Sequence, residues 1–126
     1  MNGRCRGTHM LIGFIVLMAT MMAGAMSPTE AIGPKKFTLI SVNFDGTDIW
    51  LPSSLIVDQG DDVELTLINK LDVPHGFKID VFGIESVIEG KSKSTVTFTA
   101  KTVGVHPYTC QLHPQHIGGQ IQVMAR

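Results

Sequence analysis

The chain has 126 residues, of which 44% are hydrophobic and 17% are charged, and its formal net charge is -1. This length predicts one small domain, and the near-zero charge excludes a nucleic-acid binder that depends on a broad basic surface. Two cysteines, Cys5 and Cys110, are too few for a disulfide-rich scaffold or a four-thiolate zinc ribbon.

The first 25 residues have the layout of a secretory signal peptide. Arg4 and Arg6 precede the uncharged apolar run 10–22, and the small residues 23–25 follow it. We therefore predict a signal peptide over residues 1–25. The alternative is an uncleaved membrane anchor, because the run approaches the roughly 20 apolar residues of a membrane span when it is extended to Met26.

Cleavage near Ala25 would leave a short linker at 26–35 and a domain at 36–126. The mature chain would have 8 basic and 11 acidic side chains, and thus a formal charge of -3. It would be periplasmic or secreted, and its single thiol, Cys110, would lie in an oxidising compartment. A lone thiol in that setting needs a chemical role, and metal ligation is the leading one.

The domain is expected to be all-β. β-branched and aromatic residues alternate with polar ones in short segments, and turn signals such as Asp58–Asp62 and Glu89–Ser92 lie between them. No segment has a sustained helical period. We predict a two-sheet sandwich of about seven strands, at residues 37–42, 50–57, 63–67, 77–82, 94–100, 104–110 and 120–123.

Metal-ligating residue types gather at two places in this pattern. Cys110, His113 and His116 lie within seven residues at the end of a predicted strand, and His75 lies in an upstream loop. One thiolate and two imidazoles with a weaker fourth ligand suit an electron-transfer copper ion. Zinc bound by one cysteine and three histidines is the chemical alternative.

Other candidate ligands are less well placed. His106 lies four residues before Cys110, roughly 13 Å away along an extended strand, and is expected at the rim or in the core. Met124 is expected to be too distant and to fill the core. The carbonyl of Pro74 is a candidate for a weak axial contact.

From Trp50 onward the chain resembles the cupredoxins, small copper proteins with a Greek-key β-sandwich. In that family a Cys-x2-His-x2-Met or Cys-x2-His-x4-Met loop precedes the final strand, and a further histidine comes from an upstream loop. The resemblance implies that His75, Cys110 and His113 are the equatorial ligands of one copper ion. His116 stands where the shorter loop has its methionine, so the resemblance implies an axial imidazole.

Residues 76–83 and 110–114 are also similar to nitrosocyanin, a red copper protein of ammonia oxidisers. That protein has glutamate at the position of His75, and its last histidine lies at the position of Gly118. The copper site of this chain is therefore expected to differ from the open site of that protein.

Three functions are compatible with this ligand set. The first is a one-electron carrier whose copper ion alternates between Cu(I) and Cu(II). Such a carrier is not an enzyme, and it exchanges electrons with a redox partner protein. The second is a copper enzyme or small-molecule binder, and the third is a copper delivery or storage protein. No nucleic-acid partner is expected, and membrane contact is expected only through an uncleaved N-terminal segment. An apolar collar of Leu112, Pro114 and Ile117 around His113 is expected to contact the redox partner.

Overall fold

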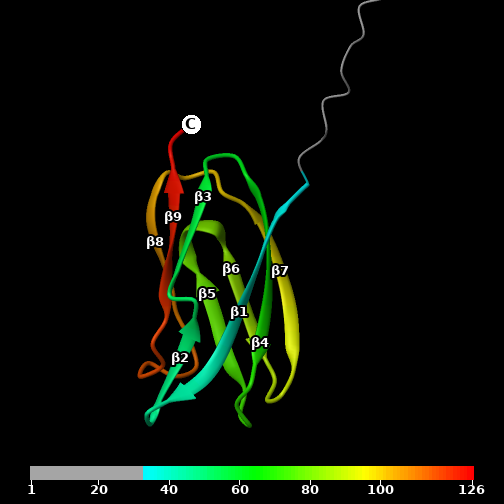
Figure 1. Ribbon diagram of the computed structural model, residues 1–126, viewed down its shortest axis with the longest axis vertical. Coiled ribbons are helices and arrows are strands. Elements are labelled where there is room, and N and C mark those ends of the chain that lie inside the picture. The colour runs from blue at the N-terminus through cyan, green and yellow to red at the C-terminus, as the bar shows by residue number, and fades with distance from the viewer. Residues whose placement is uncertain (1–32) are drawn as a thin grey trace, which may run out of the picture. The chain divides into compact units, whose positions relative to one another are not determined.

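The computed structural model describes residues 33–126, so the predicted signal peptide or anchor and most of the predicted linker lie outside the described residues. No helix in this part of the chain is long and apolar enough to cross a membrane. The described chain forms nine strands and one short 3-10 helix (Figure 1): β1 (Lys35–Phe44), β2 (Thr47–Leu51), β3 (Ser54–Asp58), β4 (Asp62–Asn69), β5 (His75–Ile79), η1 (Asp80–Phe82), β6 (Ile84–Ile88), β7 (Lys93–Thr99), β8 (Gly104–Tyr108) and β9 (Gly119–Met124).

The strands form a β-sandwich, as predicted. One sheet has the order β2-β1-β4-β7, and a second has the order β3-β9-β8. The β5-β6 hairpin is joined to the second sheet just beyond β8, where Lys78 and Thr109 exchange backbone hydrogen bonds of 2.9 and 3.0 Å. The β1-β4 and β3-β9 pairs are parallel, and the other strand pairs are antiparallel.

The hydrophobic core lies between the sheets. Strand alternation places Val63, Leu65 and Leu67 of β4 on the inner face, because successive side chains of a strand point to opposite faces. Three aromatic side chains fill the middle of the core. Phe77 packs edge-on against Trp50 with ring centroids 5.5 Å apart, and it lies 5.2 Å from the ring of Tyr108.

The predicted strand at 50–57 is two strands that belong to different sheets. β2 ends at Leu51, and β3 begins at Ser54 after Pro52, which has no N–H to continue a ladder. β2 instead folds back on β1 through the two-residue turn Asp45-Gly46. Both turn residues have positive φ, 49° and 81°, which is the backbone of the hairpin turn that Asp-Gly favours.

The predicted strand at 77–82 also differs from the structure. β5 ends at Ile79, and Val81 and Phe82 lie in η1, which accounts for their break with the two-residue alternation. The chain then reverses at Gly83 into β6, a strand that the sequence reading missed. Met124 was expected in the core, but it is 43% exposed at the end of β9.

Candidate metal centre

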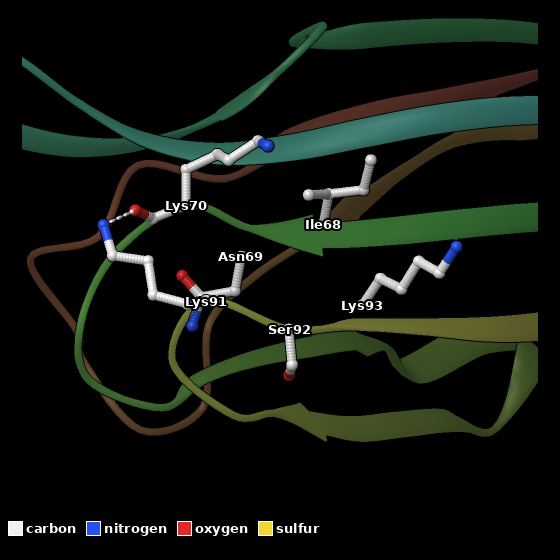
Figure 2. Close-up of a pocket in the computed structure, with 6 residues that line it drawn as sticks. All are labelled: Ile68, Asn69, Lys70, Lys91, Ser92 and Lys93. Atoms are coloured by element: carbon white, nitrogen blue, oxygen red, sulfur yellow. Dashed lines mark hydrogen bonds between the residues drawn. The ribbon is translucent and has the colours of Figure 1, made fainter.

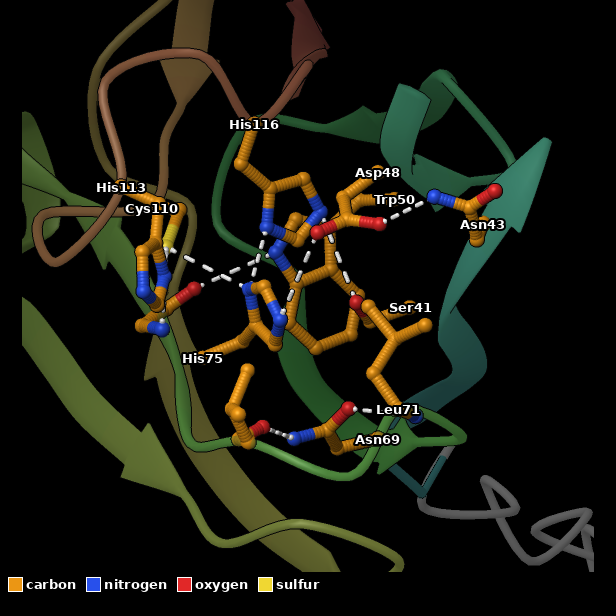
Figure 3. Close-up of polar contacts among 12 residues, drawn as sticks. Ser41, Asn43, Asp48, Trp50, Asn69, Leu71, His75, Cys110, His113 and His116 are labelled. Atoms are coloured by element: carbon orange, nitrogen blue, oxygen red, sulfur yellow. Dashed lines mark hydrogen bonds and ion pairs between the residues drawn. The ribbon is translucent and has the colours of Figure 1, made fainter. Parts of the chain in front are cut away.

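The four predicted ligands come from the start of one strand and from one loop, at the same end of the sandwich (Figures 1 and 3). His75 is the first residue of β5, and Cys110, His113 and His116 lie in the loop between β8 and β9. The β1-β2 hairpin lies against the second loop, because the backbone N–H of Trp50 donates to the carbonyl of Ile117 at 2.9 Å. These contacts join three segments that are far apart in the sequence.

The loop that leads into His75 is built around the buried side chain of Asn69, at the end of β4. Its Nδ2 donates to the carbonyls of Val73 and Ile88 at 2.8 and 3.0 Å. Its Oδ1 accepts a hydrogen bond of 2.9 Å from the backbone N–H of Leu71. These bonds connect the β4-β5 loop to β6 and fix the point at which His75 enters the site.

The loop after β8 is held against the β5-β6 hairpin by two contacts of its side chains with backbone atoms. The backbone N–H of Gly76 donates to the Sγ of Cys110 at 3.1 Å, and the Nε2 of Gln111 donates to the carbonyl of Ser86 at 3.0 Å. A Cβ at position 76 would overlap the side-chain amide of Gln111. Glycine at this position leaves room for the Gln111 side chain to reach Ser86 across the hairpin.

Three ligand atoms converge in the space between these loops. The Sγ of Cys110 lies 3.9 Å from the Nδ1 of His75 and 3.7 Å from the Nδ1 of His113. One ligand atom from each of the three residues lies within 4.8 Å of the other two. His75 and Cys110 are buried and His113 is half-buried, so solvent reaches this group only on the side of His113.

Burial favours the neutral form of the imidazole that a metal ion needs. Desolvation holds the pKa of His75 below its ordinary value of 6.5, and the neighbouring charge of His113 lowers that pKa further. A neutral ring offers a free nitrogen lone pair to an ion. Together the residues offer one soft sulfur and two nitrogen donors, which is the donor set that suits copper in electron-transfer sites. The residues present therefore fit a copper ion.

His116 lies beside this group rather than within it. Its Nδ1 is 2.8 Å from the Nδ1 of His75, and its Nε2 is 3.5 Å from the Oγ of Ser41. Its ring stacks on Trp50 with a centroid distance of 5.7 Å and an interplanar angle of 6°. Burial holds the pKa of His116 below its ordinary value. Its role as the axial ligand stays a prediction.

His106 lies outside this group, and its Nε2 is 2.8 Å from the carbonyl of Thr102. Pro74 directly precedes His75 in the β4-β5 loop, and an axial contact of its carbonyl stays a prediction. The sequence reading missed Ser41, Asp48 and Trp50, all of which face the histidines (Figure 3). The turn signal Asp45-Gly46 would have predicted the hairpin that brings Asp48 and Trp50 to the site.

A depression of about 390 Å³ lies beside the end of β4 (Figure 2). The Nζ of Lys91 reaches across it and donates to the carbonyl of Lys70 at 2.6 Å. None of the predicted ligands lines it; its lining residues are Ile68, Asn69, Lys70, Lys91, Ser92 and Lys93.

Several solved structures with the same fold are copper proteins. The copper-containing nitrite reductase from Thermus scotoductus SA-01 is 24% identical with a TM-score of 0.61, over 75% of this chain and 28% of that one. The copper nitrite reductase from Nitrosomonas europaea is 22% identical with a TM-score of 0.65, over 75% of this chain and 42% of that one. Auracyanin A from Chloroflexus aurantiacus, a "blue" copper protein, is 21% identical with a TM-score of 0.60, over 72% of this chain and 99% of that one.

At these identities the likeness shows the fold alone, and the chain spans less than half the length of either nitrite reductase. No curated protein sequence matches the chain. A family model described as a cupredoxin-like domain matches residues 13–123. This match covers most of the sequence. The chain therefore belongs to the cupredoxin-like family, and the ion for which its thiolate and imidazoles are grouped is copper.

Proposed function

We propose that this protein is an exported one-electron carrier whose copper ligands are His75, Cys110 and His113, with His116 as the axial ligand. Copper in such a site supplies one electron at a time, because it alternates between Cu(I) and Cu(II). The two loops and the buried Asn69 hold the ligand side chains in place before any ion arrives. A preformed ligand set limits the rearrangement that accompanies a change of oxidation state.

The observation that carries this proposal is the exposure of His113. His75 and Cys110 are buried, whereas His113 is half-buried and reaches toward solvent. The neighbouring Leu112 and Ile117 are 44% and 55% exposed, and Pro114 is also exposed. Leu112, Pro114 and Ile117 are the residues of the predicted apolar collar, and their exposure supports a docking role for the surface beside His113. An apolar surface of this kind suits brief contact with a redox partner protein.

The case for export comes from the sequence. The basic, apolar and small-residue layout of residues 1–25 supports a periplasmic or secreted location. Cys110 is a free cysteine among the described residues, and metal ligation gives a free thiol a role in an oxidising compartment. The proposed partner is a redox protein that exchanges one electron with the copper ion.

The test is the visible spectrum of the Cu(II)-loaded protein, with and without azide. We expect intense charge transfer from the Cys110 thiolate that azide leaves unchanged. Cys110→Ser should abolish this band, whereas the control Thr109→Ser, at the exposed neighbouring position, should retain it. A band that persists in Cys110→Ser would overturn the ligand assignment.

A second candidate is a copper protein that binds or transforms a small molecule. It is favoured by the position of His116, whose nitrogens are not part of the three-residue group. If His116 hydrogen-bonds to His75 instead of binding the ion, the fourth coordination position is open to an exogenous ligand. A strong change of the spectrum on addition of azide would support this candidate over the carrier.

A further inference from the structure

One nitrogen of the buried His75 ring has no hydrogen-bond partner in the described part of the chain. This atom is Nε2, and the ring is only 1% exposed. The nearest acidic group is Asp48 on β2, whose Oδ2 lies 3.8 Å from it (Figure 3). That separation is about 1 Å longer than an ordinary N–H···O hydrogen bond.

The chemistry of the ring determines what this nitrogen needs. Nδ1 of His75 faces Cys110, and an ion bound there uses the lone pair of this nitrogen, so the proton of the neutral ligating ring must lie on Nε2. A buried N–H without an acceptor is destabilising, because it has lost its hydrogen bond to water and gained none in return. The ligating form of His75 therefore requires a hydrogen-bond acceptor next to Nε2, on the side where the Asp48 carboxylate lies.

Asp48 is itself held from two directions. Its Oδ1 accepts a hydrogen bond of 2.7 Å from the Nδ2 of Asn43, on the opposite strand of the hairpin. Its backbone carbonyl accepts a hydrogen bond of 2.9 Å from the N–H of Ile117, in the loop that carries His113 and His116. The carboxylate is thus tied both to the hairpin and to the ligand loop, with Oδ2 left to face His75.

We propose that Asp48 is a positioning residue of the copper site, which accepts the Nε2–H hydrogen bond of His75 when Nδ1 binds the ion. The proposal rests on the ligand role of His75 in the proposed function. A carboxylate behind a metal-binding histidine fixes the tautomer and raises the basicity of the ring. A more basic nitrogen favours Cu(II) over Cu(I), so Asp48 lowers the reduction potential.

The first test compares Asp48→Asn with Asp45→Asn. Asp45 is an exposed residue in the turn of the same hairpin, so both variants remove one negative charge, but only the first replaces the charged acceptor that faces His75 by a weaker neutral amide. We expect Asp48→Asn to lose about 10- to 100-fold in Cu(II) affinity and to raise the potential. A tenfold greater loss for Cu(II) than for Cu(I) corresponds to about 59 mV. Asp45→Asn should match the parent protein in both measurements.

The second test needs no variant and therefore does not depend on how Asp48→Asn folds. In the ¹⁵N-labelled Cu(I) protein, which is diamagnetic, NMR should show His75 as the Nε2–H tautomer, with a proton that exchanges slowly with water. A rapidly exchanging Nε2–H, or the other tautomer, would overturn the proposal. Equal shifts of potential in Asp48→Asn and Asp45→Asn would also overturn the proposal, because they would reflect lost charge alone. An unchanged potential and Cu(II) affinity in Asp48→Asn would overturn it as well.

Failure of this proposal can be told apart from failure of the proposed function. If Asp48 has no role but the ligands are correct, the thiolate band still disappears in Cys110→Ser. If the ligand assignment itself is wrong, that band is absent from the parent protein or survives in Cys110→Ser.

Discussion

The Nδ1 atoms of His75 and His116 lie 2.8 Å apart at the buried end of the sandwich. In this contact one neutral ring donates a proton and the other accepts it. The Nδ1 of His75 also faces Cys110 and His113. His116 therefore either turns its Nδ1 lone pair to the ion as a fourth ligand, with Ser41 near its other nitrogen, or remains a hydrogen-bond partner of His75.

His116→Met distinguishes these roles. A thioether is a weaker donor to Cu(II) than an imidazole, and the axial ligand is one control on the potential of such sites. If His116 is the axial ligand, the parent protein should be green or red, and the variant should shift toward blue and have a higher potential. Visible spectroscopy and voltammetry measure both, with His106→Met on β8 as the control. An unchanged spectrum and potential would assign the fourth position to water or to the carbonyl of Pro74.

Gly76→Ala tests the contact between the two ligand loops. The new Cβ would overlap the end of the flexible Gln111 side chain, which must turn aside and give up its hydrogen bond to the carbonyl of Ser86. We expect a loss of about 0.5–1.5 kcal/mol in the free energy of unfolding, as for one lost hydrogen bond, and at most a small shift of the thiolate band. Urea unfolding and the visible spectrum measure the two effects. Gly33→Ala, where the Cβ meets no atom within 4 Å, should change neither.

Leu112→Asp and Ile117→Asp test the apolar collar. A charge beside His113 should repel a second copy of the protein and cost desolvation, so electron self-exchange measured by NMR should slow. Both side chains point to solvent, so the copper spectrum should change little. Ile56→Asp is the matched control, because Ile56 is 61% exposed on β3. Equal rates in all three variants and the parent protein would place the docking face elsewhere.

Acid should destabilise the protein through Asp61, in the turn between β3 and β4. Its carboxylate is 2.6 Å from the Nζ of Lys35 and 2.6 Å from the Nη2 of Arg126. The Lys35 hydrogen bond, the backbone N–H of Asp58 and the nearby positive charges hold the pKa of Asp61 below its ordinary 3.8. A carboxyl with a lowered folded pKa stabilises the fold above the unfolded pKa, and this contribution is lost as pH falls through the folded value.

Asp61→Asn should therefore be less stable than the parent protein at pH 7, and the difference should shrink below about pH 3.8. Urea unfolding at a series of pH values measures this difference. Asp45→Asn, at an exposed turn position, is the control for removal of one carboxylate. A difference between Asp61→Asn and the parent that stays constant down to pH 2 would contradict the role of this ion cluster.

Two kinds of structure were accessible from the sequence. The strands at 37–42, 63–67, 94–100, 104–110 and 120–123 correspond to β1, β4, β7, β8 and β9, because alternation of buried and exposed residues is a local property. The donor types were accessible as well, since a thiol and histidines at short spacing after a strand are visible in the chain. Cys110 and His113 lie close together because they share one loop. The position of His75 beside them depends on how the β4-β5 segment packs against that loop.

By itself, then, the sequence determined the all-β class, most of the strands and the set of side chains able to bind an ion. Only the tertiary structure decided that β2 and β3 part into different sheets, and that Asp48, Ser41 and Trp50 meet the histidines. It also decided that His116 stacks on Trp50 beside His75 and not within the group of three. The physical reason is that strand periodicity depends on residues that are neighbours in the sequence. These contacts instead join segments up to 75 residues apart, and such segments meet only when the whole sandwich packs.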